Sequence, residues 1–214
     1  MGILQPGGSV ARYAAWATWA LITELASASR GTDTDGNRAG VICGPVPGPT
    51  MKLEGSCHCG GVRFALCTAH PYPFNYCYCS ICRKTAGSGG YAINLAADNS
   101  TLQVQGKEKI TVYRARILDQ ESGAMSESPA RRHFCSICGS ALWAWDPRWP
   151  DLIHPFASAI DTQLPVPSEH THLMAGSKAS WVELRSAGND KVFDNYPDES
   201  IAQWHRRLGL EDVR

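Results

Sequence analysis

The chain has 214 residues and no net formal charge, because 20 lysines and arginines balance 20 aspartates and glutamates. This length allows one domain with a sizeable core plus a tail. The charge balance argues against binding nucleic acid or anionic lipid through bulk charge. The basic residues at 131–133 and 206–207 are therefore interpreted as solvated surface.

Residues 1–50 differ in composition from the rest and are predicted to be an extension and linker. Residues 11–29 are rich in Ala and Trp with helical spacing, which indicates a loose helix or a poorly ordered segment. The apolar run inside it is too short to span a bilayer and ends at Glu24, so we expect no integral membrane segment and no exported protein. A helix lying on a membrane surface is the alternative. Residues 31–50 are rich in Gly, Pro and polar residues, as linkers are.

From residue 51 short alternating apolar runs are separated by turn residues, which predicts a mainly β domain over 51–208. The strands are expected at 62–66, 102–104, 110–114, 141–145, 152–156 and 181–184. One helix is predicted over 199–208, with Asp198 as its N-cap and Gly209 as its stop. The polar segment 114–129 could be a lid or a plain loop.

Seven of the nine cysteines fall into three clusters. The clusters are Cys57 with Cys59, then Cys77 with Cys79 and Cys82, then Cys135 with Cys138. Thiols one or two residues apart sit on one tight turn and can bind one zinc ion. The odd number and these spacings argue against disulfides and predict a reducing, cytoplasmic location. No specific role is expected for Cys43, and Cys67 is expected to be a packed or free thiol.

A glycine follows the second cysteine in two of the clusters, at Gly60 and Gly139. Glycine takes the positive φ of a turn that aims backbone N–H groups at sulfur. Joined through one zinc ion, the first and third clusters would make a closed four-cysteine structural site that ties an early hairpin to a late one. Three of the seven clustered cysteines remain once these four are assigned to the structural site.

The remaining trio of Cys77, Cys79 and Cys82 is followed by Arg83 and Lys84, which could offset its charge or face solvent. Three thiolates with an open fourth position favour a soft fourth ligand, such as a substrate thiol, over water. The alternative is a second structural zinc closed by a histidine. The candidates for that fourth ligand are His58, His70, His133, His154, His170 and His172.

Three segments together resemble the glutathione-dependent formaldehyde-activating enzyme family. They are residues 55–64 (GSCHCGGVRF), 77–88 (CYCSICRKTAGS) and 134–142 (FCSICGSAL), with weaker echoes at 172–181 and 193–197. The resemblance implies an Mss4-like, zinc-stapled fold with two zinc ions. It implies that the first and third clusters hold the structural zinc, and that the trio holds the catalytic one. It also implies a carbon–sulfur lyase that interconverts glutathione plus formaldehyde and S-hydroxymethylglutathione.

The leading hypothesis is thus a zinc-dependent lyase or related thiol-adduct enzyme, acting on a thiol such as glutathione and a small electrophile. A non-catalytic, zinc-scaffolded protein-binding module is the alternative. For it, Trp143, Trp145 and Trp149 could form a partner surface, although strand alternation favours packing for the first two. A third reading keeps the site and changes the electrophile.

In that third reading His154, Asp161 or His172 could act as acid or base. No spacing argument selects one of them. The oligomeric state does not follow from the sequence.

Overall fold

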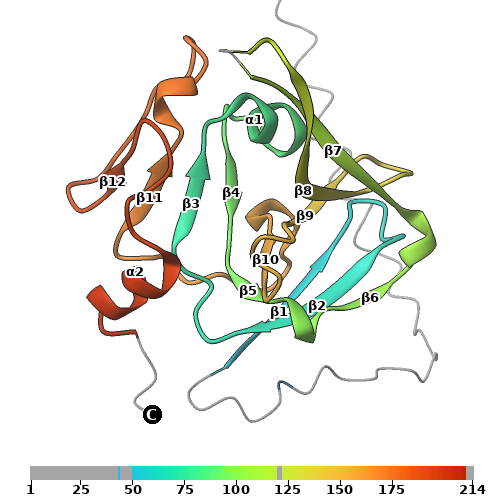
Figure 1. Ribbon diagram of the computed structural model, residues 1–214. Helices are drawn as coiled ribbons and strands as arrows, with labels where there is room; N and C mark the ends of the chain where they lie inside the picture. The colour runs from blue at the N-terminus through green and yellow to red at the C-terminus, as the bar shows by residue number, and fades with distance from the viewer. Residues whose placement is uncertain (1–42, 44–49, 120–121, 211–214) are drawn as a thin grey trace, which may run out of the picture. The chain divides into compact units, whose positions relative to one another are not determined.

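The computed structural model describes residues 43, 50–119 and 122–210 (Figure 1). The chain divides into one unit over residues 1–39 and another over residues 40–214, and every described residue belongs to the second unit. The helix predicted over 11–29 and almost all of the linker predicted over 31–50 lie outside the described residues.

Three sheets form the domain, which confirms the mainly β class. The first sheet has the order β1-β2-β6, with strands Met51–Ser56, Arg63–Thr68 and Gln103–Gln105. The second has the order β5-β10-β9-β8-β7, with strands Ala97–Asp98, Leu152–Pro155, Ala141–Trp145, Met125–Cys135 and Ile110–Leu118. The third has the order β12-β11-β3-β4, with strands Lys191–Val192, His170–Leu173, Phe74–Cys77 and Ala92–Asn94.

Two short α-helices accompany the sheets: α1 (Ser80–Ala86) and α2 (Ile201–Arg207). Figure 1 shows α1 beside the β7–β8 ribbon and α2 near the C-terminus. Four 3₁₀ turns complete the described elements: Asn99–Thr101, Lys107–Lys109, Ala157–Ala159 and Ala175–Ser177. The short C-terminal helix is therefore confirmed.

The hydrophobic core contains members of the cysteine clusters. Leu53, Leu142 and Trp143 pack in one cluster that includes Cys57 and Cys135. A second cluster joins Cys77 and Cys82 to Phe156 and Leu173. Each cysteine site is thus an extension of packed apolar structure, which fixes the backbone that carries the sulfurs.

Three local predictions were wrong. No strand forms at 181–184, where Trp181 lies in a turn and is exposed. Alternation alone had suggested a strand there, but no neighbouring strand pairs with the segment. The sequence analysis did not predict helix α1, because a helix of only 7 residues is too short to show the apolar spacing of an amphipathic helix. The cap of α2 is Ser200, whose hydroxyl accepts from the Gln203 N–H in a capping box, and not Asp198.

The segment 114–129 is mostly neither lid nor loop. Its described residues include the far half of a β ribbon, where Arg116, Ile117 and Leu118 of β7 pair with Glu127, Ser126 and Met125 of β8. A bulge between Arg114 and Arg116 shifts the register of this ribbon.

Candidate metal centres and the adjoining cavity

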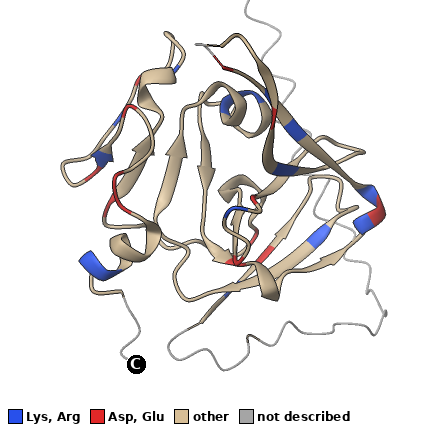
Figure 2. Cartoon of the chain, in the orientation of Figure 1, with Lys and Arg blue, Asp and Glu red and all other residues tan. Residues whose placement is uncertain are grey.

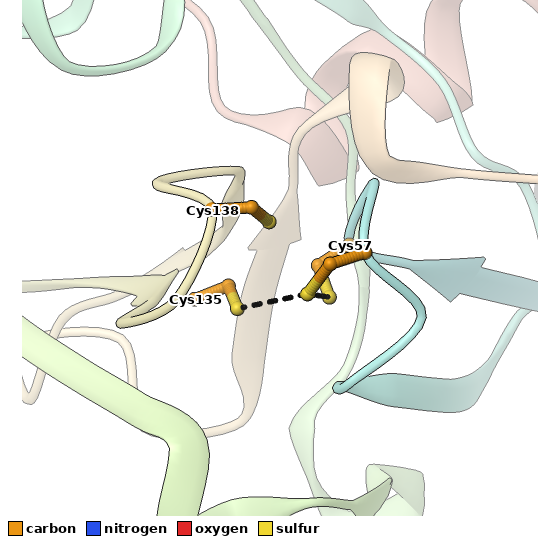
Figure 3. A group of neighbouring side chains, drawn as sticks. Cys57, Cys135 and Cys138 are labelled. Carbon is orange, nitrogen blue, oxygen red and sulfur yellow. Dashed lines mark hydrogen bonds between the residues drawn. The ribbon is translucent and has the colours of Figure 1, made fainter.

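The turn between β1 and β2 and the turn between β8 and β9 bring four cysteines together (Figure 3). The sulfurs of Cys57, Cys59, Cys135 and Cys138 all lie within 4.8 Å of one another. Two of the separations are 3.5 Å, between Cys57 and Cys59, and 3.8 Å, between Cys59 and Cys135. A zinc ion with four bonds of about 2.3 Å needs sulfurs about 3.8 Å apart. The donor set therefore fits a tetrahedral zinc.

Backbone geometry prepares these four sulfurs for a cation. Gly60 and Gly139 have φ of 71° and 74°, the positive values expected from the sequence. The Val62 N–H donates to Sγ of Cys57 at 3.1 Å. A hydrogen bond with the Ser140 hydroxyl, 3.2 Å from Sγ, lowers the pKa of Cys138 to about 5. Such contacts favour the thiolate that a metal requires.

The trio lies where β3 passes into α1. Cys77 ends β3, Cys79 caps the helix, and Cys82 lies in its first turn. The Cys82 N–H donates to Sγ of Cys79 at 3.3 Å. The three sulfurs lie within 4.8 Å of one another, and no further His, Cys, Asp or Glu of the described residues joins that group. These donors fit three positions of a tetrahedral zinc.

Three sulfurs this close cannot all ionise unless a cation is present. Hydrogen bonds with the thiols of Cys77 and Cys82 lower the pKa of Cys79 to about 2. The same contact with Cys79, followed by that with Cys82 and by burial, raises the pKa of Cys77 far above its ordinary value. A divalent cation reverses this penalty, so metal binding must release protons from the trio.

The histidines considered as a fourth ligand lie elsewhere. His133 stacks on Trp143 with ring centroids 5.0 Å apart, and His70 packs against His205. The backbone of His58 belongs to the turn of the four-cysteine site, where it bonds Ser140. His154 bonds the carbonyl of Leu95 through Nδ1.

A buried polar chain supports the loop that carries the trio. The hydroxyl of Tyr78, between Cys77 and Cys79, bonds Nδ1 of His172 at 2.9 Å. Nε2 of His172 faces Oδ2 of Asp190 at 3.4 Å, and Nδ1 of His170 lies 2.9 Å from Oδ1 of the same carboxylate. The arrangement ties the trio's loop to β11 and to the segment before β12.

The pKa shifts in this polar chain favour an ionised Asp190 and a neutral His172. Burial raises the pKa of Asp190, but hydrogen bonds from the His170 and Ala187 N–H groups outweigh it and lower the pKa to about 2. Burial lowers the pKa of His172. A neutral His172 that donates a hydrogen bond to Asp190 from Nε2 can accept a hydrogen bond from the Tyr78 hydroxyl at Nδ1. Asp190 was missed from the sequence because it lies in a turn with no periodicity.

A cavity of about 340 Å³ lies between α1 and the β7–β8 ribbon, and two of its lining residues, Arg132 and Phe156, contact the trio. Thr85, Arg132, Phe134 and Phe156 are among the residues that line it. Nη2 of Arg132 lies 3.9 Å from Sγ of Cys82. The sequence interpretation of residues 131–133 as solvated surface is wrong for Arg132 and His133, because both are half-buried. Figure 2 shows basic residues on α1 and on the ribbon beside it.

A second cavity, of about 470 Å³, lies by the four-cysteine site and is lined by Asp161, His58 and three serines among others. Asp161 is thus separated from His172, which belongs to the polar chain behind the trio. The three acid–base candidates do not meet: His154 bonds Leu95 and His172 bonds Tyr78 and Asp190.

The three tryptophans considered as a partner surface differ in their burial. Trp143 is buried against Phe64 and His133, Trp145 is half-buried beneath Arg131, and Trp149 is exposed. Packing therefore accounts for Trp143, as strand alternation predicted.

Cys43 and Cys67 form a disulfide, with Cα atoms 5.7 Å apart. The expectations of a free or packed thiol at Cys67, of no role for Cys43 and of no disulfide were wrong for this pair, whereas the seven clustered cysteines are free. The signal was present in the sequence: once seven cysteines are taken as ligands, these two remain as a pair. Among the described residues, no helix is long and apolar enough to cross a membrane.

The fold and the sites together define the class: a mainly β domain held by two cysteine clusters of metal-site geometry. The model of the glutathione-dependent formaldehyde-activating enzyme (GFA) family matches residues 52–175, and the chain belongs to this family. A protein of Halomonas elongata, provisionally named as a glutathione-dependent formaldehyde-activating enzyme, is 62% identical over 162 residues. The match covers 76% of this chain and 99% of that protein.

The chain is also similar to a Rhodobacter sphaeroides protein known from a crystal structure. The identity is 26%, the TM-score is 0.40, and the match covers 54% of this chain and 92% of the other.

Proposed function

We propose that the protein is a zinc-dependent carbon–sulfur lyase of the glutathione-dependent formaldehyde-activating type. Its domain spans residues 51–208 and holds two zinc ions. Cys57, Cys59, Cys135 and Cys138 hold the structural zinc. Cys77, Cys79 and Cys82 hold the catalytic one. The enzyme works in the cytoplasm on a small thiol such as glutathione and a small electrophile such as formaldehyde.

One observation carries this proposal: the trio gathers three sulfurs without a fourth protein ligand among the described residues, and a cavity lined by Arg132 lies next to Cys82. Zinc held there would supply a coordination position at which a substrate thiol is kept ionised at neutral pH. Membership of the family supports the choice of glutathione and formaldehyde.

The proposed reaction needs no oxidant. The sulfur of the thiol forms a bond to the carbonyl carbon, the C=O π bond breaks, and the thiol proton ends on the new hydroxyl oxygen. The reverse reaction breaks the same carbon–sulfur bond. The chain contributes the fixed trio, the adjoining cavity for the rest of the thiol, and the Tyr78–His172–Asp190 support that holds the loop in place.

The test is NMR exchange spectroscopy on glutathione, formaldehyde and their adduct. The zinc-loaded protein should accelerate exchange above the buffer rate, and Cys79→Ser should lose most of that acceleration while keeping its fold. Wild type that binds both metals and does not exceed buffer would instead favour the zinc-scaffolded binding module.

A further inference from the structure

Arg132 has N–H donors that the described residues leave without hydrogen-bond partners. Its Nε and Nη1 atoms are buried without a hydrogen-bond partner, and it takes part in none of the ion pairs formed among the described residues. By contrast, Arg148 binds the Asp146 carboxylate with two nitrogens, and Arg207 binds Glu169 in the same way. A half-buried guanidinium with unused donors requires an explanation.

The trio accounts for only part of the hydrogen-bonding capacity of this guanidinium. The contact from Nη2 to Sγ of Cys82 is long, at 3.9 Å, and uses one of the five N–H donors of the guanidinium. The rest of the environment is apolar or neutral: Phe134, Phe156 and Thr85 line the same cavity. No carboxylate of the described residues lines it.

The cavity has the size for a small organic ligand. Its volume is about 340 Å³, within the range of sites that enclose small molecules. Arg132 stands between the cavity and Cys82, so a ligand that reaches the trio with its sulfur passes the guanidinium. A planar guanidinium binds a carboxylate with two parallel hydrogen bonds from two nitrogens of one edge, and each unused nitrogen of Arg132 shares an edge with Nη2.

We propose that Arg132 binds a carboxylate of the substrate, and that the site therefore selects thiols that carry a carboxylate. This inference rests on the proposed function for the role of the sulfur. The competing role for Arg132 is a counter-charge for the trio alone, which would affect charged and neutral thiols equally.

The chain offers a matched control at the neighbouring residue of β8. Arg131 points to the opposite side of the strand, where its guanidinium lies 5.1 Å above the ring of Trp145. Arg131→Gln removes the same charge from the same strand without touching the cavity. Arg132→Gln and Arg132→Lys remove the charge and the planar fork, respectively.

The experiment is calorimetric titration of the zinc-loaded protein with glutathione and with glutathione diethyl ester, which has the same thiol and no carboxylate. Wild type and Arg131→Gln should bind glutathione about 10- to 100-fold more tightly than the diester. Arg132→Gln should bind the two alike, and Arg132→Lys should lie between. Equal affinity of wild type for both ligands overturns the proposal, as does an equal loss for both ligands in Arg132→Gln.

A third ligand separates this inference from the proposed function. S-methylglutathione keeps both carboxylates and has no thiol to ionise. Its binding should also weaken about 10-fold or more in Arg132→Gln and remain unchanged in Arg131→Gln. If that holds while the protein catalyses no exchange, the carboxylate site stands and the lyase proposal fails. If S-methylglutathione binds all three proteins alike, or binds none, the role of Arg132 is refuted whatever the activity.

Discussion

The two cysteine sites use the same donor atom and differ in what surrounds it. The four-cysteine site joins two turns that are far apart in sequence, each with a glycine at positive φ. The trio comes from one strand–helix junction and lies beside Arg132, which keeps unused N–H donors, and a buried polar chain. The difference teaches that ligand number and neighbourhood together separate a structural site from a reactive one.

The largest effect is expected from breaking the four-cysteine site. Cys135→Ser removes a buried cysteine of the proposed structural zinc site, and binding of such a zinc ion contributes about 10 kcal/mol to folding. The domain should lose its cooperative thermal transition, followed by circular dichroism. Cys79→Ser, at the half-buried member of the trio, is the control and should keep that transition. Two variants of similar stability would remove the distinction between the sites.

Asp190→Asn should weaken metal binding at the trio and leave metal binding at the four-cysteine site unchanged. The carboxylate accepts hydrogen bonds from both His170 and His172 and from backbone N–H groups, and an amide cannot accept all of them. We expect a loss of about 2 kcal/mol in stability and roughly a 10-fold weaker metal affinity at the trio.

Metal competition with a chromophoric chelator would measure both affinities in Asp190→Asn. Ser140→Ala is the counterpart at the other site, because it removes the hydroxyl 3.2 Å from Sγ of Cys138. It should weaken the four-cysteine site and leave the trio unchanged. Weakening of both sites by either variant would contradict their independence.

Mild acid should destabilise the folded domain through its buried histidines. Burial lowers the pKa values of His133, His154 and His172 below the ordinary 6.5. As pH falls below 6.5, the unfolded chain takes up protons that the folded chain refuses, so the folded state loses stability. The ordinary pKa of 6.5 limits the loss between pH 7 and pH 5.5 to at most about 1 kcal/mol for each of these histidines.

Urea unfolding at these two pH values, with zinc in excess, measures the loss. His154→Gln should reduce the pH dependence by the share of one histidine. An unchanged pH dependence in that variant would show that His154 protonates normally in the folded protein.

The smallest effect concerns the helix α2. Ser200→Ala should cost about 1 kcal/mol, because its hydroxyl caps the helix, whereas Asp198→Ala should cost almost nothing. Chemical denaturation of the two variants compares them directly. Neither variant should alter metal content, since α2 lies outside both cysteine sites.

The sequence predicted what local spacing determines. The cysteine turns, their glycines and β9 follow from neighbouring residues, so they could be placed before the structure was known. Arg132 and Asp190 could not. Arg132 reaches Cys82 across 50 residues of sequence, and its place in a basic run resembled solvated surface. Whether a charge is solvated or enclosed depends on which strand packs beside it, and no period in the sequence encodes that.

The strand predicted at 181–184 failed for a related reason. Alternation describes which faces a strand would present, while pairing depends on a free neighbouring edge. Gly90 instead approaches Val182 so closely that a Cβ there would lie 2.2 Å from its side chain, and the segment packs as an irregular turn.

Zinc content per chain tests the central claim most directly. We predict two zinc ions in the purified protein, and about one in Cys77→Ser with the thermal transition retained. A wild type with a single zinc ion, or a Cys77→Ser variant that keeps both, would contradict a division into one structural and one reactive site.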